Sequence, residues 1–80
     1  FFTKPECQLC DAALFVVEKV RQAHAFELER VDISAAGNEA WADRYGQHIP
    51  VVHLNGQEIF RHRVDERRFR ALMRRAVGPA

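Results

Sequence analysis

Cys7 and Cys10 are the residues of this 80-residue chain best suited to chemistry. When the second cysteine of such a pair lies in the first turn of a helix, the first can attack a disulfide and the second can resolve the mixed disulfide. C-x-x-C is also half of a zinc site, but structural zinc needs four ligands and there is no second cysteine pair. The four histidines form no ligand-like couple: His24, His48, His53 and His62. We favour redox chemistry over zinc or two unrelated buried cysteines.

The residues around the pair predict a strand followed by a helix. Residues 1–3 read as the remnant of a strand whose beginning is truncated, and residues 4–6 as a loop. Apolar residues then recur at helical spacing as far as Ala23: Leu9, Ala13, Val16, Val17 and Val20. Three more apolar residues widen this stripe, so we expect the helix to be covered on more than one side: Ala12, Leu14 and Phe15.

This placement puts Cys7 just before a helix N-terminus. Unpaired amide groups and the helix dipole stabilise an anion there, which favours the thiolate. Lys4 adds to this effect, whereas Glu6 and Asp11 oppose it.

The rest of the chain predicts strands and helices that complete one α/β domain. We expect a strand over 26–33, a helix over 39–45 closed by Gly46, strands over 49–54 and 57–60, and a last helix capped by Asp65 and ended by Gly78-Pro79. The last helix presents an apolar face: Phe69, Leu72, Met73 and Ala76. Asn55-Gly56 predicts a hairpin turn, and Pro50 belongs at the entry of its strand. The order β-α-β-α-β-β-α implies a four-stranded mixed sheet flanked by helices, the minimal thioredoxin arrangement, in a single domain over 1–80.

Charge and composition narrow the classes of partner. Residues 61–80 carry seven arginines against two carboxylates, or +5, while residues 1–60 carry −4. We interpret the basic end as the solvated face of a helix, because no nucleic-acid motif or stacking aromatic accompanies it. No apolar run is long enough to span a membrane. Two cysteines are too few for a secreted disulfide scaffold, so we expect a cytoplasmic monomer that binds neither nucleic acid nor membrane.

Several stretches together resemble a known family. Residues 3–10 resemble the active-site loop of glutaredoxins, and Val31-Asp32-Ile33 the end of their second strand. Three further stretches are similar to an uncharacterised glutaredoxin-like branch with a C-x-x-C motif: residues 41–46, 49–57 and 62–64. The similarity covers essentially the whole chain.

The resemblance implies roles for six residues. Cys7 would be the nucleophile and Cys10 the resolving thiol. Pro50 would be a cis-proline facing the cysteines, with Ile49 offering backbone groups to an extended substrate. Two residues match glutathione-binding positions: Lys4, which would approach a carboxylate, and Asp65, which would lie by the γ-glutamyl group.

The sequence also departs from the glutaredoxin pattern at two places. Gln8-Leu9 replaces the usual Pro-Tyr between the cysteines, which restores an N–H at residue 8. Arg61-His62-Arg63 replaces a Gly-Gly pair, so these side chains either obstruct a ligand or supply cationic contacts. We place His62 and Arg63 among the substrate-binding residues and interpret His48 as a solvated loop residue. Glutathione therefore stays open as a co-substrate.

We therefore predict a thiol–disulfide oxidoreductase that exchanges disulfides with a protein or with glutathione and binds no organic cofactor. Two alternatives to this function remain. The same two thiolates could join those of a partner to hold a metal ion or iron–sulfur cluster. A thioredoxin-fold interaction domain could instead use its basic last helix for docking. We expect structural roles for His53, inside a strand, and for Trp41 and Tyr45, packed as a pair.

Overall fold

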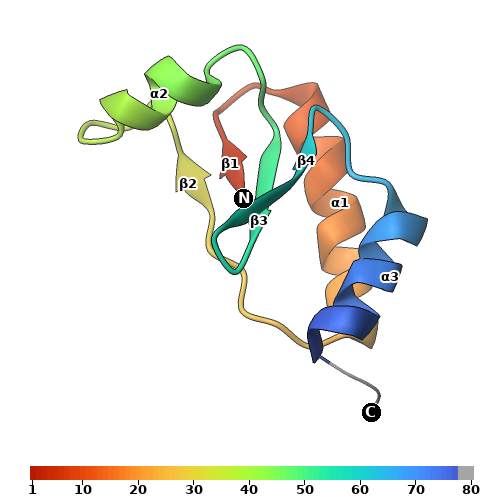
Figure 1. Cartoon of the computed structure of the whole chain (residues 1–80). Coiled ribbons are helices and arrows are strands. Elements are labelled where there is room, and N and C mark those ends of the chain that lie inside the picture. The colour runs from red at the N-terminus through yellow and green to blue at the C-terminus, as the bar shows by residue number, and fades with distance from the viewer. Residues whose placement is uncertain (78–80) are drawn as a thin grey trace.

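The computed structural model describes residues 1–77, and the elements follow the predicted order (Figure 1). They are β1 Phe2–Thr3, α1 Gln8–Ala23, β2 Val31–Asp32, α2 Glu39–Tyr45, β3 Val51–Leu54, β4 Gln57–Arg61 and α3 Glu66–Val77. The predicted helix stop at Gly78-Pro79 lies outside the described residues.

The four strands form one mixed sheet in the order β2-β1-β3-β4. β1 runs parallel to β2 and antiparallel to β3, and Phe2 pairs with Val31 on one side and Val51 on the other. β3 and β4 form the predicted hairpin, in which Asn55 and Gly56 both have positive φ, at 52° and 83°. These are the backbone angles that an Asn-Gly turn of this kind requires.

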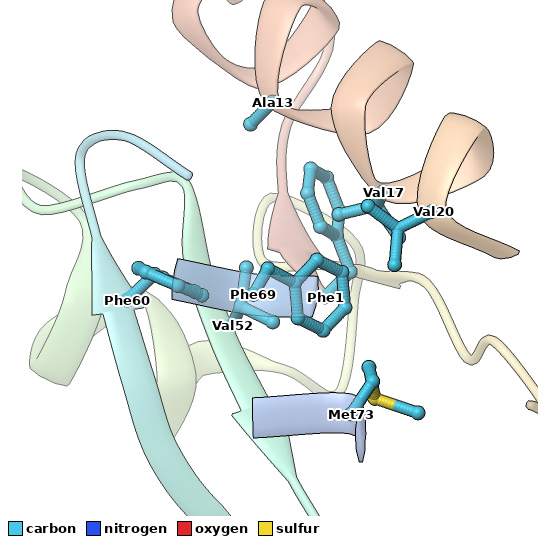
Figure 2. Packing of buried hydrophobic residues seen from close by; sticks show 8 residues of the cluster. All are labelled: Phe1, Ala13, Val17, Val20, Val52, Phe60, Phe69 and Met73. Atoms are coloured by element: carbon cyan, nitrogen blue, oxygen red, sulfur yellow. The ribbon is translucent and has the colours of Figure 1, made fainter. Parts of the chain in front are cut away.

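Helices cover both faces of the sheet. The first cluster lies between the sheet, α1 and α3, and its buried members are labelled in Figure 2: Phe1, Ala13, Val17, Val20, Val52, Phe60, Phe69 and Met73. The second cluster reaches across the other face to α2, and its buried members are Phe2, Cys10, Ile33, Tyr45, Ile49 and Val51. Alternation along the strands sends Val51 to the second cluster and Val52 to the first.

The predicted strand over 26–33 is wrong in length, because β2 contains only Val31–Asp32. β2 is an edge strand that pairs with β1 alone, and β1 offers it just two residues. Phe26 and Leu28 nevertheless pack against the first cluster, as their alternation with exposed glutamates indicated. The alternation of apolar and charged side chains thus identified which side chains are buried. The length of β1 set how many residues of this segment pair as a strand.

α1 is covered by the sheet and by α3, and Leu14 packs against the first cluster, but the other two residues predicted to widen its apolar stripe stay outside the core. Leu9 is 51% exposed and Phe15 is 72% exposed, and Ala12 also faces solvent. The helix meets the sheet with one face and α3 with its flank, so within residues 1–77 no element covers its outer side. On α3, Phe69 and Met73 are buried as expected, but the predicted Ala76 is exposed.

Two predicted helix ends are confirmed, each with its own geometry. The Asp65 carboxylate accepts a 3.0 Å hydrogen bond from the Arg68 amide, so Asp65 caps α3. Gly46 ends α2 in a right-handed conformation rather than the left-handed one common at helix ends. A Cβ at Gly46 would come within 2.5 Å of the Ala42 carbonyl oxygen, so the close approach itself requires glycine.

Candidate functional site

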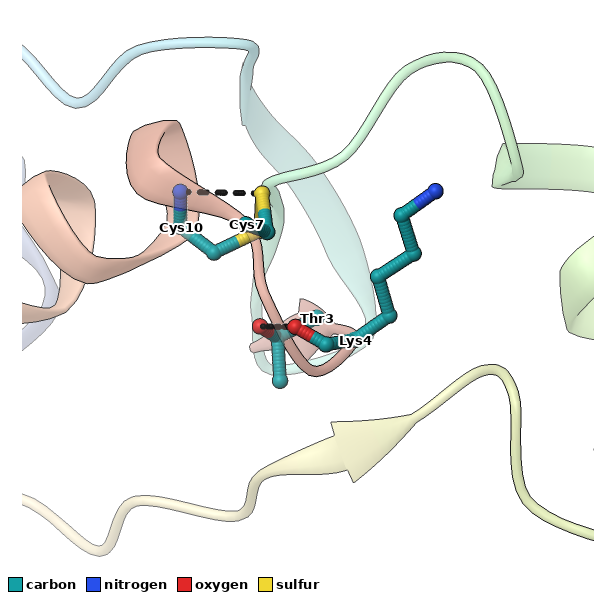
Figure 3. Close-up of a disulfide and its surroundings, with 4 residues drawn as sticks. All are labelled: Thr3, Lys4, Cys7 and Cys10. Atoms are coloured by element: carbon teal, nitrogen blue, oxygen red, sulfur yellow. Dashed lines mark hydrogen bonds between the residues drawn. A yellow bond between two sulfur atoms is a disulfide. The ribbon is translucent and has the colours of Figure 1, made fainter.

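The two cysteines form a disulfide where β1 passes into α1 (Figure 3). Their Cα atoms are 5.1 Å apart. Cys7 is the N-cap of α1: its sulfur accepts a 3.1 Å hydrogen bond from the Cys10 amide, and its carbonyl accepts one of 3.0 Å from Asp11. We expected amides at the N-terminus of this helix to stabilise an anion, and one of them, the Cys10 amide, already contacts the Cys7 sulfur.

The two sulfurs differ in access. Cys10 is 2% exposed and belongs to the second cluster, whereas Cys7 is partly exposed and only packs against that cluster. An incoming thiol or disulfide can thus reach Cys7 but not Cys10. This asymmetry suits an attacking residue and a resolving residue, because only the first must meet another molecule.

The Ile49–Pro50 peptide bond is cis, as the resemblance implied. Pro50 is fully buried at the entry of β3, and its carbonyl accepts a 2.7 Å hydrogen bond from the His62 amide. The Ile49 side chain is 7% exposed and lies in the same cluster as Cys10. The fold therefore brings the segment leading to Pro50 up to the cysteine pair.

Two histidines from distant parts of the sequence lie together beside Pro50. The rings of His48 and His62 have centroids 5.6 Å apart. His62 has a φ of 72°, in the left-handed region that non-glycine residues seldom adopt. The sequence aligned this stretch with a Gly-Gly pair, and the backbone here retains a glycine-like conformation while carrying an imidazole.

The other predicted binding residues are spread along the same end of the fold. Lys4 lies in the exposed loop between β1 and α1, and Arg63 is exposed between β4 and α3 (Figures 1 and 3). The Asp65 carboxylate is engaged as the cap of α3. Neighbouring Arg61 is held by Glu58 through a 3.0 Å ion pair, which leaves Arg63, beside the imidazole of His62, as the arginine of residues 61–63 for which the described residues show no ion pair.

Sequence reasoning missed one polar contact near the site. The Tyr45 hydroxyl and Nε2 of His53 lie 2.9 Å apart, and Phe2 and Trp41 pack their rings against both residues. The expected Trp41–Tyr45 packing is present, with the rings 8° from parallel and 5.7 Å apart. A tyrosine ending a helix and a histidine inside an apolar strand were the available signals, but only the tertiary structure joins them.

Three further features of residues 1–77 concern metal ions, grooves and membranes. No group of three His, Cys, Asp or Glu side chains there could hold a metal ion. A groove of about 890 Å³ lies beside the β3–β4 turn and is lined by Phe26, Leu28 and Leu54 among others. None of the predicted site residues lines this groove. No helix in this range is both long and apolar enough to cross a membrane.

Comparisons with known proteins agree with this geometry. The family model described as a glutaredoxin-like domain (DUF836) matches residues 1–74. A curated relative, the glutaredoxin-like protein YDR286C homolog of Dictyostelium discoideum, is 34% identical over 70 residues, which is 82% of this chain. The match spans only 65% of that relative's length.

A solved structure shares the fold. The X-ray structure of the structural-genomics target protein XcR50 from X. campestris aligns with a TM-score of 0.73 and 26% identity, over 98% of this chain and 95% of that one. Together with the mixed sheet and its flanking helices, this likeness establishes a thioredoxin-like α/β fold. The family match and the C-x-x-C pair at the start of α1 both fit a redox-type protein of that fold.

Proposed function

Because this chain belongs to the glutaredoxin-like family, we propose that it is a thiol–disulfide oxidoreductase working through Cys7 and Cys10. One observation carries the proposal. Cys7 is partly exposed, caps α1 and accepts a hydrogen bond from the Cys10 amide, while the Cys10 side chain is buried. A sulfur so placed is both reachable and stabilised as an anion after reduction.

The reaction begins from the dithiol form. The Cys7 thiolate attacks one sulfur of a substrate disulfide, and the other substrate sulfur leaves as a thiolate and takes up a proton. The Cys10 sulfur, having lost its proton, then attacks the Cys7 sulfur of the mixed disulfide. The second substrate thiol leaves, and the Cys7–Cys10 disulfide forms. Two electrons and two protons have passed to the substrate. Two external thiol groups, from two small thiols or one protein dithiol, must return them and are themselves joined in a disulfide.

The substrate is a disulfide in a protein or in a small thiol, and glutathione is a candidate co-substrate. Lys4 and Arg63 are exposed cationic groups that suit an anionic ligand, and the exposed imidazole of His62 can add a hydrogen bond. Asp65 would meet the ammonium group of a γ-glutamyl moiety, and Ile49 would pair its backbone with an extended substrate beside Pro50. No organic cofactor takes part in this scheme.

The decisive experiment compares Cys7→Ser with Cys10→Ser. We expect Cys7→Ser to lower disulfide reduction to the rate of buffer alone. Cys10→Ser should instead accumulate a mixed disulfide on Cys7, visible by mass spectrometry. In the wild-type dithiol, iodoacetamide should modify Cys7 at a pH where an ordinary thiol, with a pKa of about 8.5, is mostly protonated. Unchanged exchange by Cys7→Ser together with ordinary alkylation would overturn the proposal.

A second measurement addresses the co-substrate. Equilibrating the protein with mixtures of reduced and oxidised glutathione gives the reduction potential of the pair. Mass spectrometry of the same samples reports whether Cys7 carries glutathione. A glutathionylated Cys7 supports a glutathione-linked cycle, whereas a pair that exchanges only with protein dithiols indicates a protein reductant.

A further inference from the structure

The contact between Tyr45 and His53 joins the two ends of the segment that carries Pro50. Tyr45 is the last residue of α2 and is 1% exposed, while His53 lies in β3. Their side chains meet at 2.9 Å on the α2 side of the sheet, among the rings of Phe2 and Trp41. The eight-residue separation between them contains the whole turn from helix to strand.

Backbone hydrogen bonds also anchor that turn, and the first of them runs from the Gly46 amide to the Ala42 carbonyl at 2.8 Å. The Tyr45 carbonyl accepts a 2.8 Å hydrogen bond from the His48 amide, and the Pro50 carbonyl accepts one from His62. Ile49 then packs in the second cluster with Cys10. A shift of Tyr45 relative to β3 would therefore move residues 46–50 with respect to the cysteine pair.

We propose that Tyr45 and His53 are positioning residues whose side-chain hydrogen bond holds segment 46–50 against the cysteine pair, and that protonation of His53 loosens this hold. The proposal rests on the proposed function for its activity measurement alone. It assigns a regulation by acid to the same site, through two side chains that touch neither sulfur.

The surroundings of His53 explain the acid sensitivity. In the neutral tautomer that carries its hydrogen on Nδ1, Nε2 of His53 accepts the hydrogen bond that the Tyr45 hydroxyl donates. A protonated imidazole can only donate, so Nε2 would then donate to the phenol oxygen and the bond would reverse. The hydroxyl hydrogen of Tyr45, a residue that is 1% exposed, would be left without its acceptor. Burial lowers the pKa of His53, Glu58 on β4 opposes that shift, and Arg44 reinforces it.

The first test follows the aromatic cluster directly. Trp41 is the single tryptophan of the chain and stacks on Tyr45, so its fluorescence reports the state of His53. Between about pH 7.5 and about pH 5 we expect one transition with its midpoint below the ordinary histidine value of about 6.5. His53→Gln, whose amide can still bond Tyr45 but cannot titrate, should abolish it. His24→Gln, which removes the histidine at the C-cap of α1, should leave it unchanged.

The second test separates positioning from packing. Tyr45→Phe keeps the ring and loses only the hydroxyl, so we expect KM for a disulfide substrate to rise about threefold to tenfold at neutral pH with kcat nearly unchanged. His53→Gln should retain the wild-type KM at neutral pH and lose its rise in acid. Amide hydrogen exchange at His48 and His62 should quicken in Tyr45→Phe, because both amides bond into this segment.

These measurements distinguish a failure of the inference from a failure of the proposed function. If the wild-type protein catalyses no disulfide exchange, the proposed function is wrong. The fluorescence and hydrogen-exchange results would still show whether the Tyr45–His53 contact holds segment 46–50 in place. If Tyr45→Phe keeps both the wild-type exchange rates at His48 and His62 and the wild-type KM, the positioning role is wrong. A transition that survives His53→Gln would exclude His53 as the acid-sensitive group.

Discussion

The two faces of the sheet are built from different chemistry. Every buried side chain of the first cluster, beneath α1 and α3, is apolar, and the rings of Phe26, Phe60 and Phe69 meet there. The second cluster, beneath α2, includes the Cys10 sulfur and the ring of Tyr45, whose hydroxyl contacts the His53 imidazole. Apolar contacts lack direction, whereas a buried hydrogen bond has one preferred geometry. The first face thus supplies stability, and the second fixes where the candidate site lies.

The largest effect should come from the first face. Phe69 is 3% exposed and its ring lies 5.9 Å from both Phe26 and Phe60. Phe69→Ala should lower the free energy of unfolding by about 3–5 kcal/mol, from lost burial and a residual cavity. Urea unfolding measures this change. If the faces divide their tasks, the alkylation rate of Cys7 in the molecules that remain folded should not change. A loss below about 1 kcal/mol would mean that the first cluster repacks freely.

A smaller loss is expected at the start of α3. Asp65→Ala removes the acceptor for the Arg68 amide and should cost about 1 kcal/mol. Asp65→Asn retains a capping oxygen without the charge, so it should keep most of that stability. The same two variants also test whether Asp65 binds glutathione. If Asp65 recognises an ammonium group, both should weaken glutathione binding by calorimetry, although only the alanine destabilises the fold.

Acid should weaken the second face gradually. The pKa of His53 is lowered on folding by burial, so the unfolded chain binds more protons once the pH falls below about 6.5. Stability should therefore be complete above that pH and decline as the pH falls through the lower folded value. Thermal unfolding between about pH 7 and about pH 5 measures the decline, and His53→Gln should remove it. The carboxylates with lowered pKa, such as Glu58 and Glu66, titrate further down and act outside this window.

The smallest effect is expected outside both faces. Phe15 is 72% exposed on the outer side of α1, so Phe15→Ala should change the free energy of unfolding by no more than about 0.5 kcal/mol. Urea unfolding beside Phe69→Ala makes the comparison direct. A larger loss would show that α1 is covered on its outer side in solution.

Local signals were sufficient for most of the fold. The period of apolar residues located α1 and the buried face of α3, Asn55-Gly56 located the hairpin, and Asp65 marked a helix start. Each of these depends on neighbours within a few residues, where side-chain spacing and backbone angles decide the outcome. The cis bond before Pro50 came from resemblance to a family, because spacing alone cannot specify it.

The sequence by itself determined the order of elements and the position of the C-x-x-C pair at the start of a helix. Tertiary structure decided the rest: β2 stops at two residues because β1 offers no more, and Phe15 stays exposed because no element covers it. Only the fold makes Cys10 buried and Cys7 accessible, brings His48 to His62, and joins Tyr45 to His53. Such contacts depend on how chain-distant segments pack, and no local pattern of residues specifies that packing.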